Sequence, residues 1–217
     1  MNEVTKQGSL FSNSEKSDLF FYERNLSLKG YRSIAGIDEA GRGPLAGPVV
    51  AAAVILPEGI QMPGVDDSKK LTPLKRELLF DVVMEKAIAT GVGIAEPAEI
   101  DEINILQATL KAMLRAVDKL SASPDYLIID GINILDRDIP QQSIKKGDSL
   151  SISIAAASII AKVTRDRMML EYDRRYPSYG LASHKGYGSK LHREAIARNG
   201  PCPIHRKSFA GVKEYVK

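Results

Sequence analysis

The run at residues 34–48 most constrains the fold, because it joins an apolar strand to two adjacent acids and a glycine-rich loop. Its sequence is Ile-Ala-Gly-Ile-Asp-Glu-Ala-Gly-Arg-Gly-Pro-Leu-Ala-Gly-Pro. A strand that is apolar along its length is buried in a sheet, and it brings Asp38 and Glu39 to the edge of that sheet, where Mg²⁺ accepts hard oxygen ligands. The glycines that follow let the main chain approach a ligand closely. The run predicts a metal site that handles phosphate groups.

Two further acids occupy equivalent positions. Asp130 ends an apolar run that begins at Tyr126, and Asp148 precedes a helix rich in Ala and Ser. Two close metal ions need several anionic oxygens, and hydrolysis of a phosphodiester uses one metal for the attacking water and the other for the leaving oxygen. Taken singly, each acid also fits a turn or a helix cap.

The alternation of a strand raises a difficulty for the first pair of acids. Asp38 and Glu39 point to opposite faces while the strand stays regular. Both serve one site only if the chain turns there or if Glu39 acts partly through its carbonyl group. The glycines and prolines from residue 41 onward favour a turn.

Apolar periodicity predicts strands that alternate with helices. We expect a flexible tail over residues 1–17 and a short helix over 18–30. The expected strands cover 33–39, 47–56, 91–96, 126–130 and 141–145. The expected longer helices begin after Thr72 and cover 99–120 and 149–172. This order supports a three-layer α/β domain.

Several motifs occur in the order found in a known family. They are Gly-Ile-Asp-Glu-Ala-Gly-Arg-Gly at 36–43, Asp-Ser-Lys-Lys-Leu at 67–71, Asp-Gly at 130–131, Lys-Gly-Asp at 146–148, Ala-Ala-Ala-Ser-Ile-Ile-Ala-Lys at 155–162 and His-Lys-Gly-Tyr-Gly at 184–188. The chain resembles type 2 ribonuclease H, the ribonuclease HII family, from about residue 34 to 212. The resemblance implies an α/β ribonuclease H-like fold with a mixed five-stranded sheet and a helical C-terminal extension.

The resemblance also implies a domain organisation and an activity. Residues 1–30 would form the tail and short helix, 31–165 the catalytic domain, and 166–217 a basic helical extension that binds substrate. The implied enzyme cuts RNA paired with DNA and single ribonucleotides embedded in duplex DNA. Its metal-binding catalytic acids would be Asp38, Glu39, Asp130 and Asp148. Asp38 would bridge two Mg²⁺ or Mn²⁺ ions, and cleavage would leave a 5′-phosphate and a 3′-hydroxyl.

Substrate reading is expected from a loop, a tyrosine and several lysines. In the family, the loop of Gly41, Arg42 and Gly43 meets the 2′-hydroxyl that separates RNA from DNA. Tyr187 would sense the step from ribonucleotide to deoxyribonucleotide. We expect phosphate contacts above all from Lys69 and Lys185, with Lys145, Lys146 and Lys162 beside other matched motifs. The simpler interpretations are that Arg42 is an ordinary turn residue and that Tyr187 packs at the rim of the core.

The charge is divided along the chain. Residues 162–217 carry 13 Lys and Arg against 5 Asp and Glu, whereas the remainder carries 17 against 22, which gives a net charge of +3. A basic part beside an acidic catalytic part suits an enzyme that acts on a polyanion. A solvated basic face gives the same pattern.

The single cysteine and the apolar runs indicate the compartment, whereas the histidines raise the question of further site roles. The single cysteine, Cys202, excludes an intramolecular disulfide and suits a reducing cytoplasm. With only His205 nearby it makes a poor zinc site, so we expect a packing cysteine. His184 could protonate a leaving group, although a structural or substrate-contact role is the simpler interpretation. No apolar stretch spans a membrane and no signal-peptide core is visible, so we expect a cytoplasmic protein, working as a monomer.

The tail contains one further motif. Gln-Gly-Ser-Leu-Phe at residues 7–11 resembles the short peptides by which bacterial replication proteins dock on a sliding clamp. The alternative is that Leu10 and Phe11 fold back on the domain.

Two other functions remain open. One is another nuclease of the same fold, which would share the acids without needing the glycine-arginine loop and Tyr187 together. The other is a module that binds hybrids without cutting them, in which the acids are caps and turns.

Overall fold

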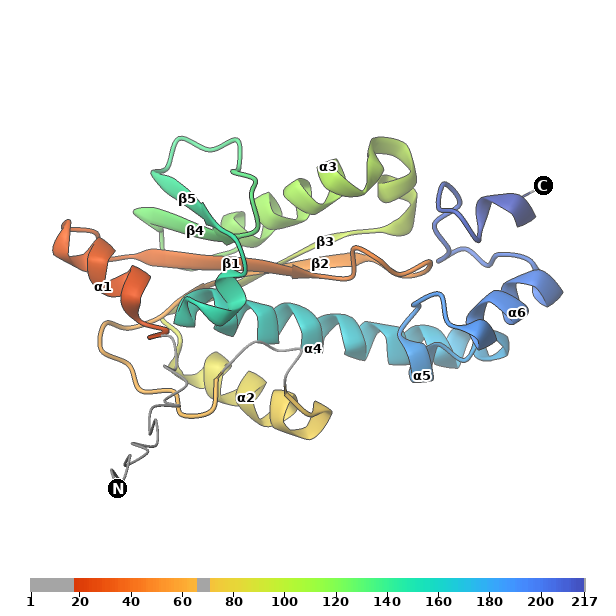
Figure 1. Cartoon of the computed structure of the whole chain (residues 1–217), viewed down its shortest axis with the longest axis horizontal. Coiled ribbons are helices and arrows are strands. Elements are labelled where there is room, and N and C mark those ends of the chain that lie inside the picture. The colour runs from red at the N-terminus through yellow and green to blue at the C-terminus, as the bar shows by residue number, and fades with distance from the viewer. Residues whose placement is uncertain (1–17, 66–70, 217) are drawn as a thin grey trace, which may run out of the picture.

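The computed structural model describes residues 18–65 and 71–216, and its centre is a mixed five-stranded sheet (Figure 1). The strands are β1 (Ile34–Ala40), β2 (Val49–Ile55), β3 (Ala89–Ala95), β4 (Tyr126–Asp130) and β5 (Gln141–Ile144). They lie in the order β3-β2-β1-β4-β5. Strand β2 is antiparallel to β1 and β3, whereas β4 is parallel to β1 and β5. Because β1 and β4 are parallel neighbours, their carboxyl ends meet at one end of the sheet.

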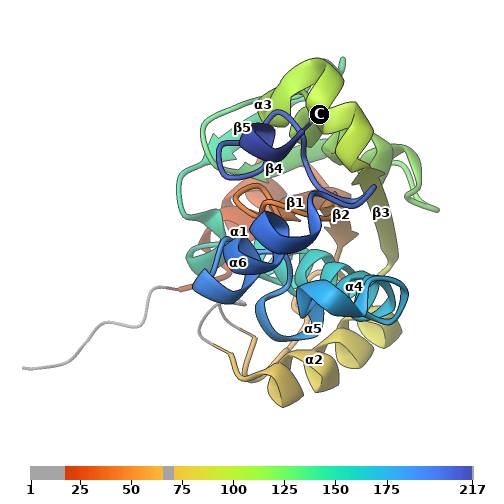
Figure 2. The ribbon, with the colours of Figure 1, turned by 90° about the vertical axis from the view of Figure 1, so that its right-hand side faces the viewer.

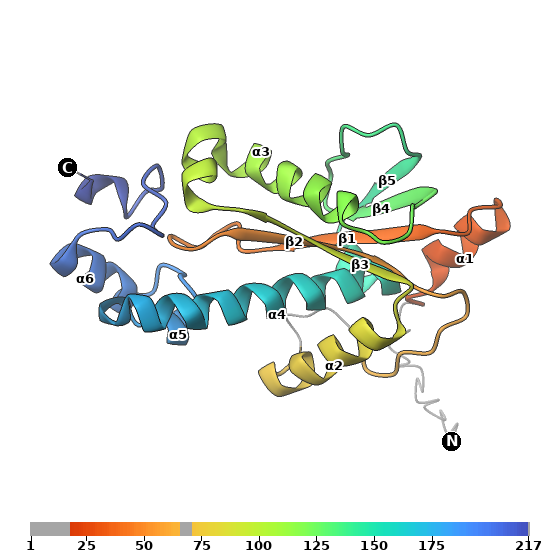
Figure 3. The ribbon, with the colours of Figure 1, turned by 180° about the vertical axis from the view of Figure 1, so that it is seen from behind.

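Helices cover both faces of the sheet. They are α1 (Phe21–Leu28), α2 (Pro73–Lys86), α3 (Pro97–Asp118), α4 (Ile152–Arg175), α5 (Leu181–His184) and α6 (Lys190–Asn199), with single 3-10 turns η2 (Gly147–Ser149), η3 (Pro177–Tyr179) and η4 (Lys213–Tyr215). Helix α3 packs on one face, while α4 packs on the other with α2 outside it (Figures 1 and 3). The predicted three-layer α/β fold is confirmed.

Small residues bring the helices close to the sheet. A Cβ added to Gly36 of β1 would lie 2.2 Å from the carbonyl carbon of Ser153, and one added to Gly93 of β3 would lie 1.9 Å from the carbonyl oxygen of Ala112. The alanine-rich first half of α4 is fully buried against β1 and β2. Helix α4 can therefore hold side chains directly beside the end of β1.

The C-terminal part of the chain packs beyond the sheet. Helix α4 continues past the strands, and α5 and α6 pack beside its second half, at the end that Figure 2 views. A separate core joins these elements to the loop after β1, with Leu45 and Ala46 against Met169, Leu181 and Ile196. The predicted division at residues 165 and 166 falls inside α4, and the assignment of two functional parts stays a prediction.

The expected elements are present with shifted ends. All five strands lie within two residues of their predicted ranges. Helix α4 begins three residues later than expected, because Ser151 accepts a hydrogen bond from the N–H of Ile154 and caps it. Helix α3 is interrupted at Asn104 (φ 69°), whose side chain accepts from the main-chain N–H groups of Leu106 and Gln107 and restarts the helix.

Some predicted features fall outside the described residues. These are the tail expected over residues 1–17, with its motif at 7–11, and residues 67–70 of the motif at 67–71, including Lys69. Within the described ranges, no helix has the length and apolar character needed to cross a membrane.

Candidate active site

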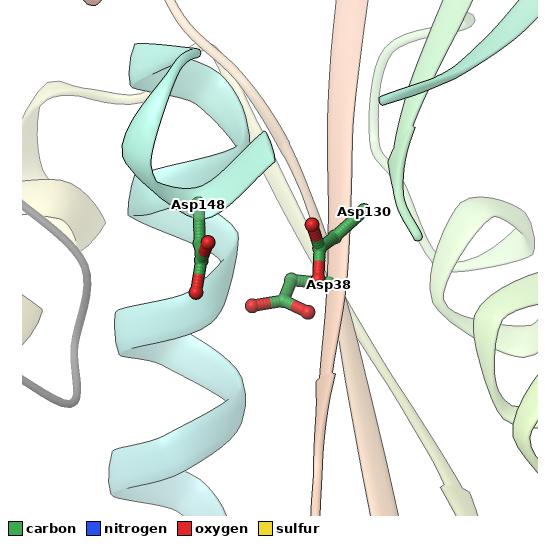
Figure 4. Close-up of side chains that lie close together, drawn as sticks. All are labelled: Asp38, Asp130 and Asp148. Atoms are coloured by element: carbon green, nitrogen blue, oxygen red, sulfur yellow. The ribbon is translucent and has the colours of Figure 1, made fainter. Parts of the chain in front are cut away.

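Three carboxylates from separate parts of the chain meet beside the carboxyl ends of β1 and β4 (Figure 4). Asp38 lies on β1, Asp130 is the last residue of β4, and Asp148 lies in the η2 turn before α4. One oxygen of each side chain lies within 4.8 Å of the others. Over residues 18–65 and 71–216, no other group of this kind could hold a metal ion.

Asp38 is the buried centre of the group. Its side chain is 3% exposed, receives a hydrogen bond from Ser158 of α4, and accepts from the main-chain N–H of Glu39 at 2.7 Å. Burial raises the pKa of Asp38 well above its usual range, and the charges of Glu39 and Asp130 raise it further. A cation would relieve this repulsion, and carboxylate oxygens are the donors that Mg²⁺ and Mn²⁺ prefer. The residues therefore fit a divalent metal site.

A hydrogen bond from the main chain links Asp130 to the turn that carries Asp148. Asp130 accepts a hydrogen bond of 2.6 Å from the N–H of Gly147, the residue before Asp148. A Cβ at Gly147 would lie 2.6 Å from a methyl group of Ile154 in α4 and 3.4 Å from the Asp130 carboxylate, so the turn packs closely against both. Asp148 is 4% exposed. The cap of α4 is Ser151, which leaves Asp148 as a candidate ligand and removes the alternative that it caps α4.

Glu39 lies beside this group of three aspartates. Strand β1 stays regular here, because Asp38 and Glu39 pair in turn with Ala52 and Ala51 of β2. The expected turn therefore comes later, and the two acids alternate across the sheet. The Glu39 carboxylate lies 3.4 Å from the guanidinium of Arg42, and Glu39 is among the residues that border the same cavity as Asp38. Its role as a metal ligand stays a prediction.

A cavity of about 220 Å³ joins the acids to the predicted substrate residues. Its walls are formed by Asp38, Glu39, Ala40, Gly41, Arg42, Gly43, Asp130, Ser158, Lys162, Arg165 and Tyr187. The side chain of Tyr187 is half exposed, and a Cβ added to Gly43 would lie 3.8 Å from its ring. The glycine-arginine loop and Tyr187 are about 145 residues apart in sequence and border the same cavity.

Two buried arginines hold the loop in place, and neither was predicted from the sequence. Arg206 donates to the carbonyl groups of Gly41, Arg42 (2.8 Å) and Gly47 (2.9 Å). Arg165 donates in a similar way to Pro48 and Ala46, each about 3 Å away, and to Lys185 at 3.0 Å. Their side chains are 0% and 1% exposed. No local pattern distinguishes them from the exposed arginines of the same segment.

The predicted lysine contacts have different outcomes. Lys162 borders the cavity, where it pairs with Asp166 at 2.6 Å, and burial lowers its pKa. The ammonium group of Lys185 instead donates to the carbonyl of Ala182, and this side chain is absent from the walls of the described cavity. His184 donates to the carbonyl of Tyr179 and stacks on His192, which is a structural role.

The sequence matches one family over most of its length. Residues 35–212 match the family described as Ribonuclease HII. This chain belongs to the ribonuclease HII family. The ribonuclease HII of Geotalea uraniireducens is 63% identical over 209 residues, covering 96% of this chain and 97% of the relative. That of Geobacter metallireducens is 62% identical, covering 95% and 97%.

Solved structures agree with this assignment. The ribonuclease H2 from Pyrococcus horikoshii superposes with a TM-score of 0.71 at 30% identity, covering 84% of this chain and 96% of the other. RNase HII in the PCNA complex from Archaeoglobus fulgidus gives 0.68 at 26% identity, covering 82% and 95%. The chain is therefore an endoribonuclease H that acts on RNA/DNA substrates, and the module without catalytic activity is set aside.

Proposed function

We propose that this ribonuclease HII cuts the RNA strand of RNA/DNA hybrids and also cuts at single ribonucleotides embedded in duplex DNA. The products would carry 5′-phosphate and 3′-hydroxyl ends. One observation carries the proposal: the loop of Gly41, Arg42 and Gly43 and the ring of Tyr187 border the same cavity as Asp38 and Asp130.

We assign Mg²⁺ or Mn²⁺ to the three aspartates, with Glu39 as the fourth acid. When bound, a divalent cation makes water a stronger nucleophile and stabilises the charge that develops on the phosphate. Asp38, Asp130 and Asp148 hold the site together from β1, β4 and the η2 turn. Ser158 and the N–H of Glu39 orient the Asp38 carboxylate through the hydrogen bonds that they donate.

The loop after β1 would read the sugar of the ribonucleotide. The carbonyl groups of Gly41 and Arg42 are engaged by Arg206, so we assign substrate contacts to the amide groups of the loop and to the guanidinium of Arg42. Lys162 borders the cavity and would contact a phosphate, as Lys69 would from outside the described residues. The basic segment 166–217 would bind the duplex backbone, and Lys185 would contribute there rather than in the cavity.

The proposal is tested with three labelled duplexes: DNA with one ribonucleotide, DNA alone, and a uniform RNA/DNA hybrid. Each is incubated with Mg²⁺, Mn²⁺ or EDTA, and the product ends are identified by ligation and phosphatase treatment. We expect metal-dependent cutting at the ribonucleotide and within the hybrid, with the all-DNA duplex intact. Cutting of the hybrid alone would remove the single-ribonucleotide activity.

Replacement of Tyr187 by Ala should selectively impair cleavage at single ribonucleotides. We expect kcat/KM for the single ribonucleotide to fall about tenfold more than that for the hybrid, because one stacking contact is worth about 1–3 kcal/mol. Tyr187→Phe, which keeps the ring, should retain most of the preference. Tyr215→Ala removes another exposed tyrosine, in η4, and serves as the control. Equal losses on both substrates would argue against the sensing role.

We also propose that residues 7–11 bind a sliding clamp. The support is the Gln-Gly-Ser-Leu-Phe motif, together with the solved PCNA complex of the Archaeoglobus fulgidus relative. Substitution of both Leu10 and Phe11 by Ala should abolish binding to an immobilised bacterial clamp and leave cleavage of free duplex unchanged. Undiminished clamp binding by that variant would eliminate the motif as the contact.

A further inference from the structure

All three histidines and the single cysteine of the chain lie together behind the loop that carries Tyr187. His184 ends α5 and His192 lies in α6, two helices that Figure 2 shows at the near end of the molecule. His205 and Cys202 follow α6. The ring of His184 stacks on that of His192 with centroids 4.4 Å apart.

The hydrogen-bond partners assign one proton arrangement to this cluster. Nδ1 of His205 accepts from the main-chain N–H of Cys202 at 3.0 Å and lies 3.1 Å from its Sγ, so the proton of His205 is on Nε2. At the other end, Nδ1 of His192 lies 2.9 Å from the carbonyl oxygen of Tyr187, which can only accept. The two Nε2 atoms are 3.1 Å apart, so His205 donates to His192. A continuous chain of donors thus runs from Cys202 to the main chain of Tyr187.

The two central rings are neutral at neutral pH. His192 and His205 are 0% and 1% exposed. Burial is the main cause that lowers the pKa of each to about 4, and the neighbouring histidines contribute to this lowering, as Arg193 does for His192. Neutral rings are required here, because a second proton on either ring would place two N–H groups face to face.

The main chain, more than side-chain packing, sets the position of the Tyr187 ring. The side chain is 49% exposed, so few contacts hold it. The carbonyl of Tyr187 accepts from His192 and from the N–H of Ser189 at 2.8 Å, while the preceding carbonyl, of Gly186, accepts from the N–H of Leu45 at 2.8 Å. These bonds join the tyrosine to α6 on one side and to the loop after β1 on the other.

We propose that His192, held by His205, is a positioning residue for Tyr187: its hydrogen bond to the Tyr187 carbonyl holds the ring at the cavity wall where the ribonucleotide is read. This inference rests on the proposed role of Tyr187 in cleavage at single ribonucleotides. Neither histidine borders the catalytic cavity, so each acts through the tyrosine rather than on the substrate.

Two variants of nearly equal shape separate positioning from packing. His192→Leu removes the donor to Tyr187, whereas His192→Asn can keep an N–H near the position of Nδ1 and loses the bond to His205. The readout is the ratio of kcat/KM on the single ribonucleotide to kcat/KM on the uniform hybrid. We expect the ratio to fall about tenfold in the Leu variant, a change of about 1.4 kcal/mol, and less than threefold in the Asn variant. Equal ratios in both variants would show that the histidine cluster only packs the core and does not position Tyr187.

A double-mutant cycle tests whether the effect passes through the tyrosine. In the Tyr187→Ala background, His192→Leu should change the ratio less than twofold, because there is no ring left to position. A tenfold change in that background would overturn the proposal. If Tyr187→Ala alone leaves the ratio unchanged, the sensing role of Tyr187 fails; if only His192→Leu leaves it unchanged, the positioning role fails.

A second pair of variants covers the case in which His192→Leu does not fold. His205→Leu removes the donor to His192, and His205→Gln retains an N–H at the position of Nε2. We expect a lowered ratio for the Leu variant with rescue by Gln, measured on samples whose folded fraction is checked by thermal unfolding. The same ratio in both variants would contradict the chain of hydrogen bonds.

Discussion

The Asp38→Asn variant should lose cleavage of every substrate by about 10³-fold or more, equivalent to at least about 4 kcal/mol of transition-state stabilisation. Asp38 is the buried centre of the three aspartates, and Asn lacks the negative charge that a divalent cation needs. The measurement is single-turnover cleavage with Mg²⁺ and with Mn²⁺, together with affinity for an uncut hybrid. Binding should survive, because the proposed substrate contacts come from the loop and the basic segment. Normal turnover would remove the metal role of Asp38.

The same substitution should stabilise the metal-free protein. The raised pKa of Asp38 means that its charged form costs stability, and this cost appears as the pH rises through that pKa. Asn has the same shape without the charge, so we expect the melting temperature in EDTA to rise by about 2–4 °C for each kcal/mol of repulsion relieved. Addition of Mg²⁺ should raise the melting temperature of this variant less than that of the unsubstituted protein. Asp136→Asn, at an exposed position of the β4–β5 connection, should change neither value.

Replacement of Arg206 by Met should cause the largest loss of stability outside the apolar core. Its guanidinium is fully buried, and burial lowers its pKa to about 9, yet the group stays charged and donates to three carbonyl groups of the loop after β1. Those carbonyls would be left without this partner. We expect a cost of about 2–4 kcal/mol, and therefore a fall in melting temperature of about 5–15 °C.

Cleavage by the folded Arg206→Met protein should also fall by about tenfold or more, because the loop to which we assign the sugar contact loses its support. Arg206→Lys should restore little of the stability or the cleavage, since one ammonium group cannot replace the planar set of donors of a guanidinium. The control is Arg174→Met in α4, whose exposed side chain pairs only with Glu171 among the described ion pairs. A melting temperature equal to that of this control would show that the guanidinium does not support the loop.

Much of the fold follows from local patterns in the sequence. Buried strands such as β2, fully apolar from Val49 to Ile55, are predicted because a short run rich in β-branched residues and bounded by Pro48 and Pro57 favours a strand over a helix. The acids at the ends of β1 and β4 are predicted to meet because parallel strands present their carboxyl ends at one end of a sheet. That reasoning identified Asp38 and Asp130, and the turn before the alanine-rich helix added Asp148.

Local sequence patterns did not predict the long-range contacts. Arg206 is 165 residues from Gly41 in the chain, and Tyr187 reaches the loop after β1 only because α4 carries the C-terminal elements back to it. Alternation showed that Asp38 and Glu39 would diverge, but where the chain turns depended on pairing with β2. The motif around Lys185 did not indicate that its ammonium group donates to the carbonyl of Ala182, and its contact with phosphate stays a prediction.

The sequence by itself determined the elements, the acids and the family, because hydrophobic periodicity and short motifs are local properties of the chain. The tertiary structure decided which buried polar groups find each other: Arg165 and Arg206 with the carbonyls of the loop, and His205 with His192. A buried polar group must be paired, but its partner depends on the packing of α4, α5 and α6 around the loop. That packing emerges only when the whole chain is folded.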